Sequence, residues 1–183
     1  TEVIVVISKP PAPGVAKKVI AGLEKSGKPC VIHFIGLEGE RDRGKLHFAG
    51  SLEEAARTAV TLSRKAEAAA SSAAESEADL DAIVKQETAG MSASQRYVRG
   101  LFTGGTLADE ALIGLHGKPA SVYSNNQTDD SFLLPDPHRS REHSVVDLGD
   151  DVFTVGRPHP MIDPSIRNER LEQESDDPEV AVL

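Results

Sequence analysis

Apolar residues gather in short runs along the chain, separated by segments rich in Gly, Pro and charged residues. Continuous, largely β-branched runs at 3–7 and 30–36 are typical of strands buried on both faces of a sheet. Between these two runs, apolar residues recur with helical spacing over residues 15–25. The pattern predicts a strand–helix–strand unit with parallel strands and a right-handed crossover.

The following segment, 37–50, is rich in charge and glycine, and we expect it to be a loop. Ser51 and Glu54 form a capping box, which predicts the start of a helix. The helical pattern then fades where Ala, Ser and Glu dominate, so 51–87 is expected to be one long helix or a broken pair. Because few large apolar groups anchor residues 66–90, we expect them to be the most mobile part of the chain.

A second alternation of strands and helices occupies the C-terminal half. The expected elements are strands at 97–103, 120–123, 145–148, 152–155 and 180–183, a helix from Thr106 to about Leu115, and a helix opened by Asp163 and Pro164. This alternation favours an α/β fold with an open, mostly parallel sheet.

The composition change divides the chain into a first domain at 1–66, a helical or flexible connector at 67–95, and a second domain at 96–183. The last strand opens where the chain stops, so we expect further sequence and an incomplete second domain. We therefore expect no activity from this chain alone.

Composition narrows the functional classes. Of 183 residues, 39% are apolar but only 4% are aromatic, and the net charge is −9, which argues against a nucleic-acid binder that stacks bases. The lone Cys30 excludes an internal disulfide framework or a cysteine-cluster zinc site, and it is expected in the core. No apolar run is long enough for a membrane span and no signal peptide is visible. We expect a cytoplasmic protein that binds neither membranes nor nucleic acid.

Charge is distributed unevenly. Residues 1–65 hold 11 Lys/Arg and 7 Asp/Glu, a balance of +4, whereas residues 66–183 hold 9 and 22, a balance of −13. The basic residues of the first part are either a solvated surface or the mouth of a site for a phosphorylated ligand.

One candidate site is the turn at Gly104, Gly105 and Thr106, between a strand and a helix. The first turn of a helix has free backbone N–H groups, and glycines allow a ligand to approach the backbone. We therefore expect these residues to bind phosphate or another anion. The alternative is an ordinary tight turn, because the spacing matches neither a Walker A loop nor the dinucleotide-binding fingerprint.

A second candidate is the proline-rich loop at 154–164. Pro158 and Pro160 stiffen the backbone around His159, which suits a nucleophile or an acid/base that must be aimed. Arg157 is suited to holding a phosphate or carboxylate with two hydrogen bonds. The alternative is a rigid structural turn, in which Asp163 only caps a helix.

A third candidate is the charged segment 41–50, where His47 precedes a helix N-terminus and lies among Arg and Lys residues. A phosphorylated His47 would be stabilised there, although a solvated loop with an incidental histidine explains the pattern equally well. We expect His33 to be a packing residue in its strand. Six further residues of the C-terminal half could bind a metal by type, but they lack the regular spacing of metal ligands. We therefore expect no metal site at Asp136, His138, His143, Asp147, Asp150 and Asp151.

Two stretches, 100–111 and 147–164, resemble the signatures of the FdrA family, acyl-CoA synthetase-like proteins related to succinyl-CoA synthetase. Residues 51–56 fit as well, so the resemblance covers nearly the whole chain. It implies flavodoxin-like ligase domains preceded in the family by a CoA-binding Rossmann domain, and the chain resembles a middle piece. The segment 43–50 stands where succinyl-CoA synthetase has a phosphate-carrying histidine. Phe48 interrupts that pattern, which makes His159, inside the signature, the better candidate for a functional histidine.

The resemblance implies acid–thiol ligation coupled to phosphate transfer, with CoA and a nucleotide, ATP or GTP with magnesium, as cosubstrates. The implied partners are a small-molecule acid and other domains or subunits of the same enzyme, and an oligomer is compatible with this. Two alternatives stay open. Some family members are associated with carbamoyl transfer from oxamate-type substrates in purine and allantoin breakdown, and a ligase fold can also serve as a non-catalytic scaffold that binds partners.

Overall fold

The computed structural model describes residues 1–37, 39–64, 77–118, 121–127 and 129–183. The chain divides into two compact units, Thr1–Ser76 and Glu77–Leu183, and each is considered by itself. This boundary lies inside the expected connector, 67–95. Among the described residues, no helix is both long enough and apolar enough to cross a bilayer.

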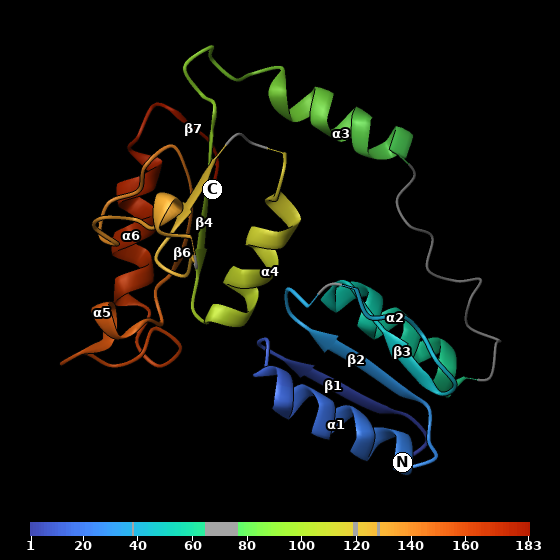
Figure 1. The fold of residues 1–183 in the computed structure, drawn as a ribbon. Coiled ribbons are helices and arrows are strands. Elements are labelled where there is room, and N and C mark those ends of the chain that lie inside the picture. Colours follow the sequence, from blue (N-terminus) through green and yellow to red (C-terminus); the bar gives the residue numbers. More distant parts are fainter. Residues whose placement is uncertain (38, 65–76, 119–120, 128) are drawn as a thin grey trace. The chain divides into compact units, whose positions relative to one another are not determined.

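The first unit is a three-stranded parallel sheet of order β1-β2-β3. Its elements are β1 (Ile4–Ser8), α1 (Pro13–Lys25), β2 (Cys30–Phe34), β3 (Leu46–Phe48) and α2 (Leu52–Ser63). The central strand β2 is buried along its whole length, as its apolar run predicts. Helices α1 and α2 cover opposite faces of this sheet (Figure 1). Ala16 and Ile20 of α1 pack against Ile32 in the core.

The start of α2 confirms the predicted capping box. The Glu54 backbone N–H donates to Ser51 Oγ at 3.1 Å, and Glu54 Oε2 in turn accepts from the Gly50 backbone N–H at 2.7 Å. Cys30 is fully buried, as predicted, and His33 is buried with its Nδ1 2.9 Å from the Ala49 carbonyl oxygen. A local signal therefore defines the start of α2.

The prediction of a loop over 37–50 is wrong in part, because β3 lies within it. Residues 46–48 pair in parallel with residues 30–32, which places His47 inside an edge strand. A three-residue strand leaves little periodicity to recognise, and only its pairing with β2 defines it. A helical segment is expected at 51–87. Helix α2 ends at Ser63, and residues 65–76 lie outside the described residues. The mobility predicted for 66–90 therefore concerns, in part, residues outside the described ranges.

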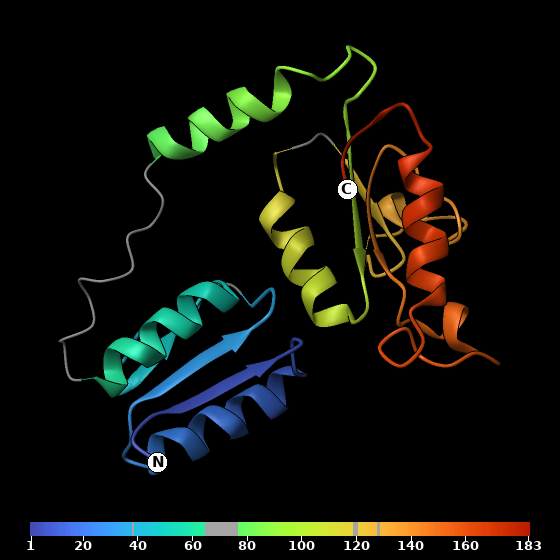
Figure 2. The ribbon, with the colours of Figure 1, turned by 180° about the vertical axis from the view of Figure 1, so that it is seen from behind.

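The second unit is a four-stranded parallel sheet of order β5-β6-β4-β7. Its elements are α3 (Glu77–Thr88), β4 (Tyr97–Phe102), α4 (Gly105–Leu115), β5 (Val122–Ser124), a 3-10 turn (Asp130–Phe132), β6 (His143–Asp147), α5 (Asp151–Thr154), α6 (Ser165–Ser175) and β7 (Val180–Val182). Helix α4 covers one face of this sheet and α5 and α6 cover the other, as the two opposite views show (Figures 1 and 2). The two parallel sheets confirm the predicted α/β class.

The order of the strands creates a reversal between β4 and β6. From β4 the chain passes through α4 to β5, on the far side of β6. From β6 it passes through α5 and α6 to β7, on the far side of β4. The two connections therefore leave neighbouring strands in opposite directions, and the crevice at such a point is where open α/β sheets bind ligands.

One predicted strand in this unit is wrong. Residues 152–155, after the acidic turn at 149–151, were expected to form a strand, but 151–154 form the helical turn α5. Asp150 Oδ1 accepts a hydrogen bond from the Val152 backbone N–H at 3.0 Å, and Phe153 is buried. The N-cap and the burial of Phe153 outweigh a weak β-propensity. Helix α6 begins at Ser165, one residue after the expected Pro164.

A buried ionic network ties α6 to β4. Glu174 of α6 accepts from Arg99 Nε of β4 at 3.0 Å and from Arg170 Nε at 2.7 Å, and all three side chains are at least nine-tenths buried. Asp177 accepts from Arg99 Nη2 at 3.1 Å, and Ser140 Oγ accepts from Arg170 Nη2 at 2.8 Å. Such a network holds only if its charges stay paired, because an unpaired buried charge is costly.

Replacing Glu174 by Ala is expected to destabilise the second unit by about 3–5 kcal/mol, because it leaves Arg99 and Arg170 buried without their shared carboxylate. Urea denaturation followed by circular dichroism measures the loss. Glu172→Ala, an exposed position on the same helix, controls for the lost glutamate and is expected to change stability by about 0.5 kcal/mol or less. Equal losses for the two variants would contradict the network's role.

Candidate functional site

The carboxyl ends of β4 and β6 lie side by side at the reversal point of the second unit. Phe102 pairs with Asp147, and the Leu148 backbone N–H donates to the Phe102 carbonyl oxygen at 2.8 Å. The segments 103–105 and 148–150 therefore leave the sheet together. Gly104, Asp147 and His159 all lie at this edge of the sheet.

The first turn of α4 is open at this edge. Gly104 is extended (φ 169°, ψ 130°) and no side chain caps the helix. A Cβ added at Gly104 would meet nothing within 4 Å, so the backbone there borders free space. Gly104 and Gly105 are half-buried and Thr106 is exposed. The three residues predicted to bind an anion thus form an accessible helix N-terminus whose N–H groups and dipole favour a negative or carbonyl oxygen.

Two asparagines after β5 hold the edge together, and sequence reasoning missed them. Asn125 bonds the backbone of Asp147 twice, accepting from its N–H at 2.9 Å and donating to its carbonyl oxygen at 3.0 Å. Asn126 donates to Asp109 Oδ1 at 2.6 Å and to the Gly105 carbonyl oxygen at 3.4 Å. The Asn-Asn pair after an apolar run was a visible signal for a polar strand end.

His159 reaches this edge from the proline-rich loop. Its Nδ1 accepts a hydrogen bond from the Met161 backbone N–H at 3.2 Å, and Pro160 beside it is buried. A Cβ added to Gly149 would lie 2.7 Å from His159 Nε2 and 3.1 Å from Asp147 Oδ1. The structure therefore brings His159 and Asp147 to the same side of Gly149, a proximity that the sequence did not reveal.

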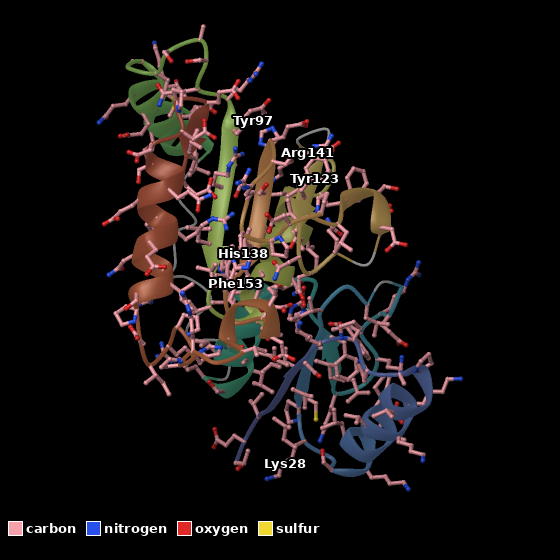
Figure 3. The ribbon with its side chains drawn as sticks, turned by 90° about the vertical axis from the view of Figure 1, so that its left-hand side faces the viewer. Lys28, Tyr97, Tyr123, His138, Arg141 and Phe153 are labelled. Atoms are coloured by element: carbon pink, nitrogen blue, oxygen red, sulfur yellow. The ribbon has the colours of Figure 1, made fainter. Side chains whose placement is uncertain are left out.

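Arg157 lies apart from that pairing. Its Nη1 is 3.7 Å from Glu169 Oε2 of α6, and the side chain is 61% exposed. It lines a cavity of about 340 Å³ between α5 and α6. His138 and Phe153 line the same cavity. Their rings meet edge to face with centroids 4.8 Å apart, and both side chains are labelled in Figure 3. The role of Arg157 as a clamp for phosphate or carboxylate stays a prediction.

Asp163 was expected to be the N-cap of the helix, but the N-cap residue of α6 is Pro164, and Asp163 lies one residue before it. Its Oδ1 accepts from the Ser165 hydroxyl at 2.5 Å and from the Ser165 backbone N–H at 3.0 Å. These two hydrogen bonds lower the pKa of Asp163 below its usual value. These hydrogen bonds join the end of the loop that carries His159 to the first residue of α6.

His47 in the first unit has a carboxylate partner. Its Nδ1 lies 3.0 Å from Asp42 Oδ2, while Asp42 Oδ1 accepts from the Phe48 backbone N–H at 2.8 Å. The hydrogen bond from Phe48, followed by the contact with His47, lowers the pKa of Asp42 below its usual value. Because His47 pairs with Val31 near the start of β2, it lies away from the carboxyl edge where α/β sheets bind ligands.

The other candidates do not converge on a metal centre. Within the described ranges, no group of three or more His, Cys, Asp or Glu side chains is placed to hold a metal ion. His143 instead lies against Tyr97, with ring centroids 5.5 Å apart, and its Nδ1 accepts from the Val98 backbone N–H at 3.2 Å. Asp150 caps α5.

Comparison with known proteins finds a family match for this part of the chain. Residues 101–183 match the CoA-ligase family. The CoA-ligase match begins in β4 and includes Gly104, Asp147 and His159. The chain is also 44% identical over 189 residues to a protein of Escherichia coli (strain K12) described as "Uncharacterized protein YahF". That alignment includes all of this chain but 35% of YahF, so the chain spans about a third of its relative's length.

The Asp42 contacts predict a pH dependence for the first unit. Because folding lowers the pKa of Asp42, its contribution to stability is present above the unfolded-state pKa and is lost as the pH falls through the folded-state pKa. Asp42→Asn keeps an oxygen that accepts from Phe48 but removes the ionisation. The stability difference between wild type and variant is expected to be constant above about pH 5 and to shrink towards about pH 3.

Thermal unfolding at a series of pH values measures this difference. Asp81→Asn, at an exposed position in α3, controls for the loss of one negative charge. A difference for Asp42→Asn that stays constant down to pH 3 would show that ionised Asp42 does not stabilise the fold.

Proposed function

We propose that the second unit is a ligase domain of an acyl-CoA synthetase-like enzyme of the FdrA type, which joins a small carboxylic acid to the thiol of CoA. The observation that carries the proposal is the open N-terminus of α4 at the reversal point, within the segment that matches the CoA-ligase family. The same edge places His159 and Asp147 around Gly149. Acid–thiol ligation needs such a place, where an activated acyl group meets hydrogen-bond donors.

The chemistry of the donors suits acyl and phosphoryl oxygens. Free N–H groups at a helix N-terminus bind oxygen that is negative or becomes negative, and the open space over Gly104 admits it to the backbone. Gly104, Gly105 and Thr106 would hold that oxygen, and His159 would act on it from the loop. A nucleotide, ATP or GTP with magnesium, would activate the acid by phosphate transfer. The other domains of the enzyme, in the same protein or in a partner subunit, would supply the remaining binding surfaces.

The proposal is tested by thioester formation in the full-length protein with CoA, a nucleotide and a panel of small carboxylic acids. Formation of an acyl-CoA with release of phosphate supports it. Carbamoyl transfer without thioester formation would favour the carbamoyltransferase alternative, and absence of both activities and of ligand binding would favour a scaffold. Either result would overturn the ligase proposal.

Substitutions of Gly105 test whether its backbone N–H takes part in this reaction. Gly105→Pro and Gly105→Ala both add a Cβ, but only proline removes the backbone N–H, and proline is well tolerated at the first position of a helix. We expect proline to lower turnover about 10²-fold, as loss of one oxyanion donor does, and alanine to lower it much less. Melting temperatures of the two variants control for folding. Equal turnover in both would rule out a role for this N–H.

A further inference from the structure

A cavity in the second unit, between α5 and α6, is large enough for a small molecule. Its volume is about 340 Å³, and pockets that bind small ligands have volumes of about 300–1,000 Å³. Leu148, Phe153 and Ile166, which are buried, form an apolar part of its lining. Val152 and Val155 also line it and are 46% and 82% exposed. A ligand with an apolar body would therefore remove apolar surface from water here.

Two opposite charges line the same cavity. Arg157 lies in the loop after α5 and Glu169 lies on α6, and Arg157 Nη1 is 3.7 Å from Glu169 Oε2. This separation is longer than a hydrogen bond, and the two side chains are 61% and 67% exposed. An exposed ion pair of this kind contributes little to stability, so it opens at small cost. Both charges are therefore available to a ligand.

Arg170, the other residue of this lining with a permanent charge, is committed to the protein itself. All three of its guanidinium nitrogens donate hydrogen bonds within the second unit, Nε to Glu174 at 2.7 Å and Nη2 to Ser140 Oγ at 2.8 Å among them. Its side chain is buried, and the carboxylate of Glu174 offsets its charge. A ligand therefore meets Arg157 and Glu169 as the charges that recognise it.

We propose that this cavity binds a small zwitterion with an apolar body, of the class of the apolar α-amino acids. The carboxylate of the ligand accepts hydrogen bonds from the Arg157 guanidinium, and its ammonium group donates to the Glu169 carboxylate. Its apolar side chain covers the lining that includes Phe153, Val155 and Ile166. The charges of protein and ligand then alternate in sign, so each has an opposite charge beside it.

Charge balance favours a zwitterion over a ligand with one charge. A carboxylic acid that has no ammonium group pairs with Arg157 but places a second negative charge beside Glu169. An amine that has no carboxylate pairs with Glu169 but places a second positive charge beside Arg157. Like charges side by side weaken binding, and a zwitterion avoids both cases.

Isothermal titration calorimetry of the full-length protein tests this specificity with leucine, isoleucine, valine and phenylalanine as probes. The amino acid that binds most tightly is then compared with its amide, which lacks the carboxylate, with its N-acetyl derivative, which lacks the ammonium group, and with glycine, which lacks the apolar body. We expect each of these to bind at least about tenfold more weakly, because each loses one set of contacts. If none of the four amino acids binds, or if any of the three comparison compounds binds as tightly, the proposal is wrong.

Two substitutions assign each charge of the ligand to its partner. We expect Arg157→Gln to weaken binding of the amino acid at least about tenfold and to leave binding of the amide unchanged, because the amide has no carboxylate to lose. Glu169→Gln is expected to weaken the amino acid equally and to leave the N-acetyl derivative unchanged. Arg167→Gln and Glu172→Gln, at exposed positions of α6 outside the cavity lining, are the matched controls and are expected to change neither.

Melting temperatures of the four variants control for folding, and we expect them to stay close to wild type because all four side chains are exposed. Unchanged binding of the amino acid in Arg157→Gln and Glu169→Gln would show that it binds elsewhere, and equal losses in the control variants would show a non-specific charge effect. Either result overturns the site. The inference does not rest on the ligase function, because the residues that hold this ligand are not those proposed to hold the acyl or phosphoryl oxygen.

Discussion

Parallel pairing of β4 with β6 is the constraint on which the candidate site depends. This register places Phe102 opposite Asp147 and sends both chains out of the sheet at the same edge. Because the connections then run in opposite directions, α4 begins on one face while α5 and the His159 loop begin on the other. A shift of this register would separate the α4 N-terminus from Gly149 and turn side chains to the other face.

Side-chain hydrogen bonds then join the segments that leave the sheet at this edge. Asn125 extends the hydrogen bonding of β6 by one residue and holds Asp147, while Asn126 ties the first turn of α4 to the end of β5. On the opposite face, Glu174 joins α6 to Arg99 of β4, and this contact holds the helix that follows the His159 loop. The loop thus ends in a helix that is joined to the sheet, and a rigid scaffold of this kind is how loops that carry function are positioned.

The two units differ in what they offer chemically. The second unit has an open helix N-terminus, a histidine and a carboxylate that both lie against Gly149, and a match to the CoA-ligase family over 101–183. The first unit has the His47–Asp42 pair on an edge strand, away from the carboxyl edge of its sheet. The His47–Asp42 contact and the cluster of His159, Gly149 and Asp147 thus lie at different places in their sheets.

Sequence alone determined the features that depend on near neighbours. The buried strand β2, the Ser51 capping box and the glycine turn before α4 each follow from residues within a few positions of one another. The same reasoning named His159 because prolines flank it. Strand β3 and helix α5 escaped it, since a pairing with β2 and the burial of Phe153 overrode weak local preferences.

Only the tertiary structure decided which of these groups lie together. Asp147 and His159 are 12 positions apart, and no spacing rule relates them, because a loop and a strand end meet only once β6 is paired and Pro160 is buried. Asn125 is separated from Asp147 by 22 positions, and its two hydrogen bonds depend on the pairing of β5 with β6. The chain carries the candidate groups locally, but parallel pairing between distant segments makes them a site, because it brings strand ends from across the sequence to one edge.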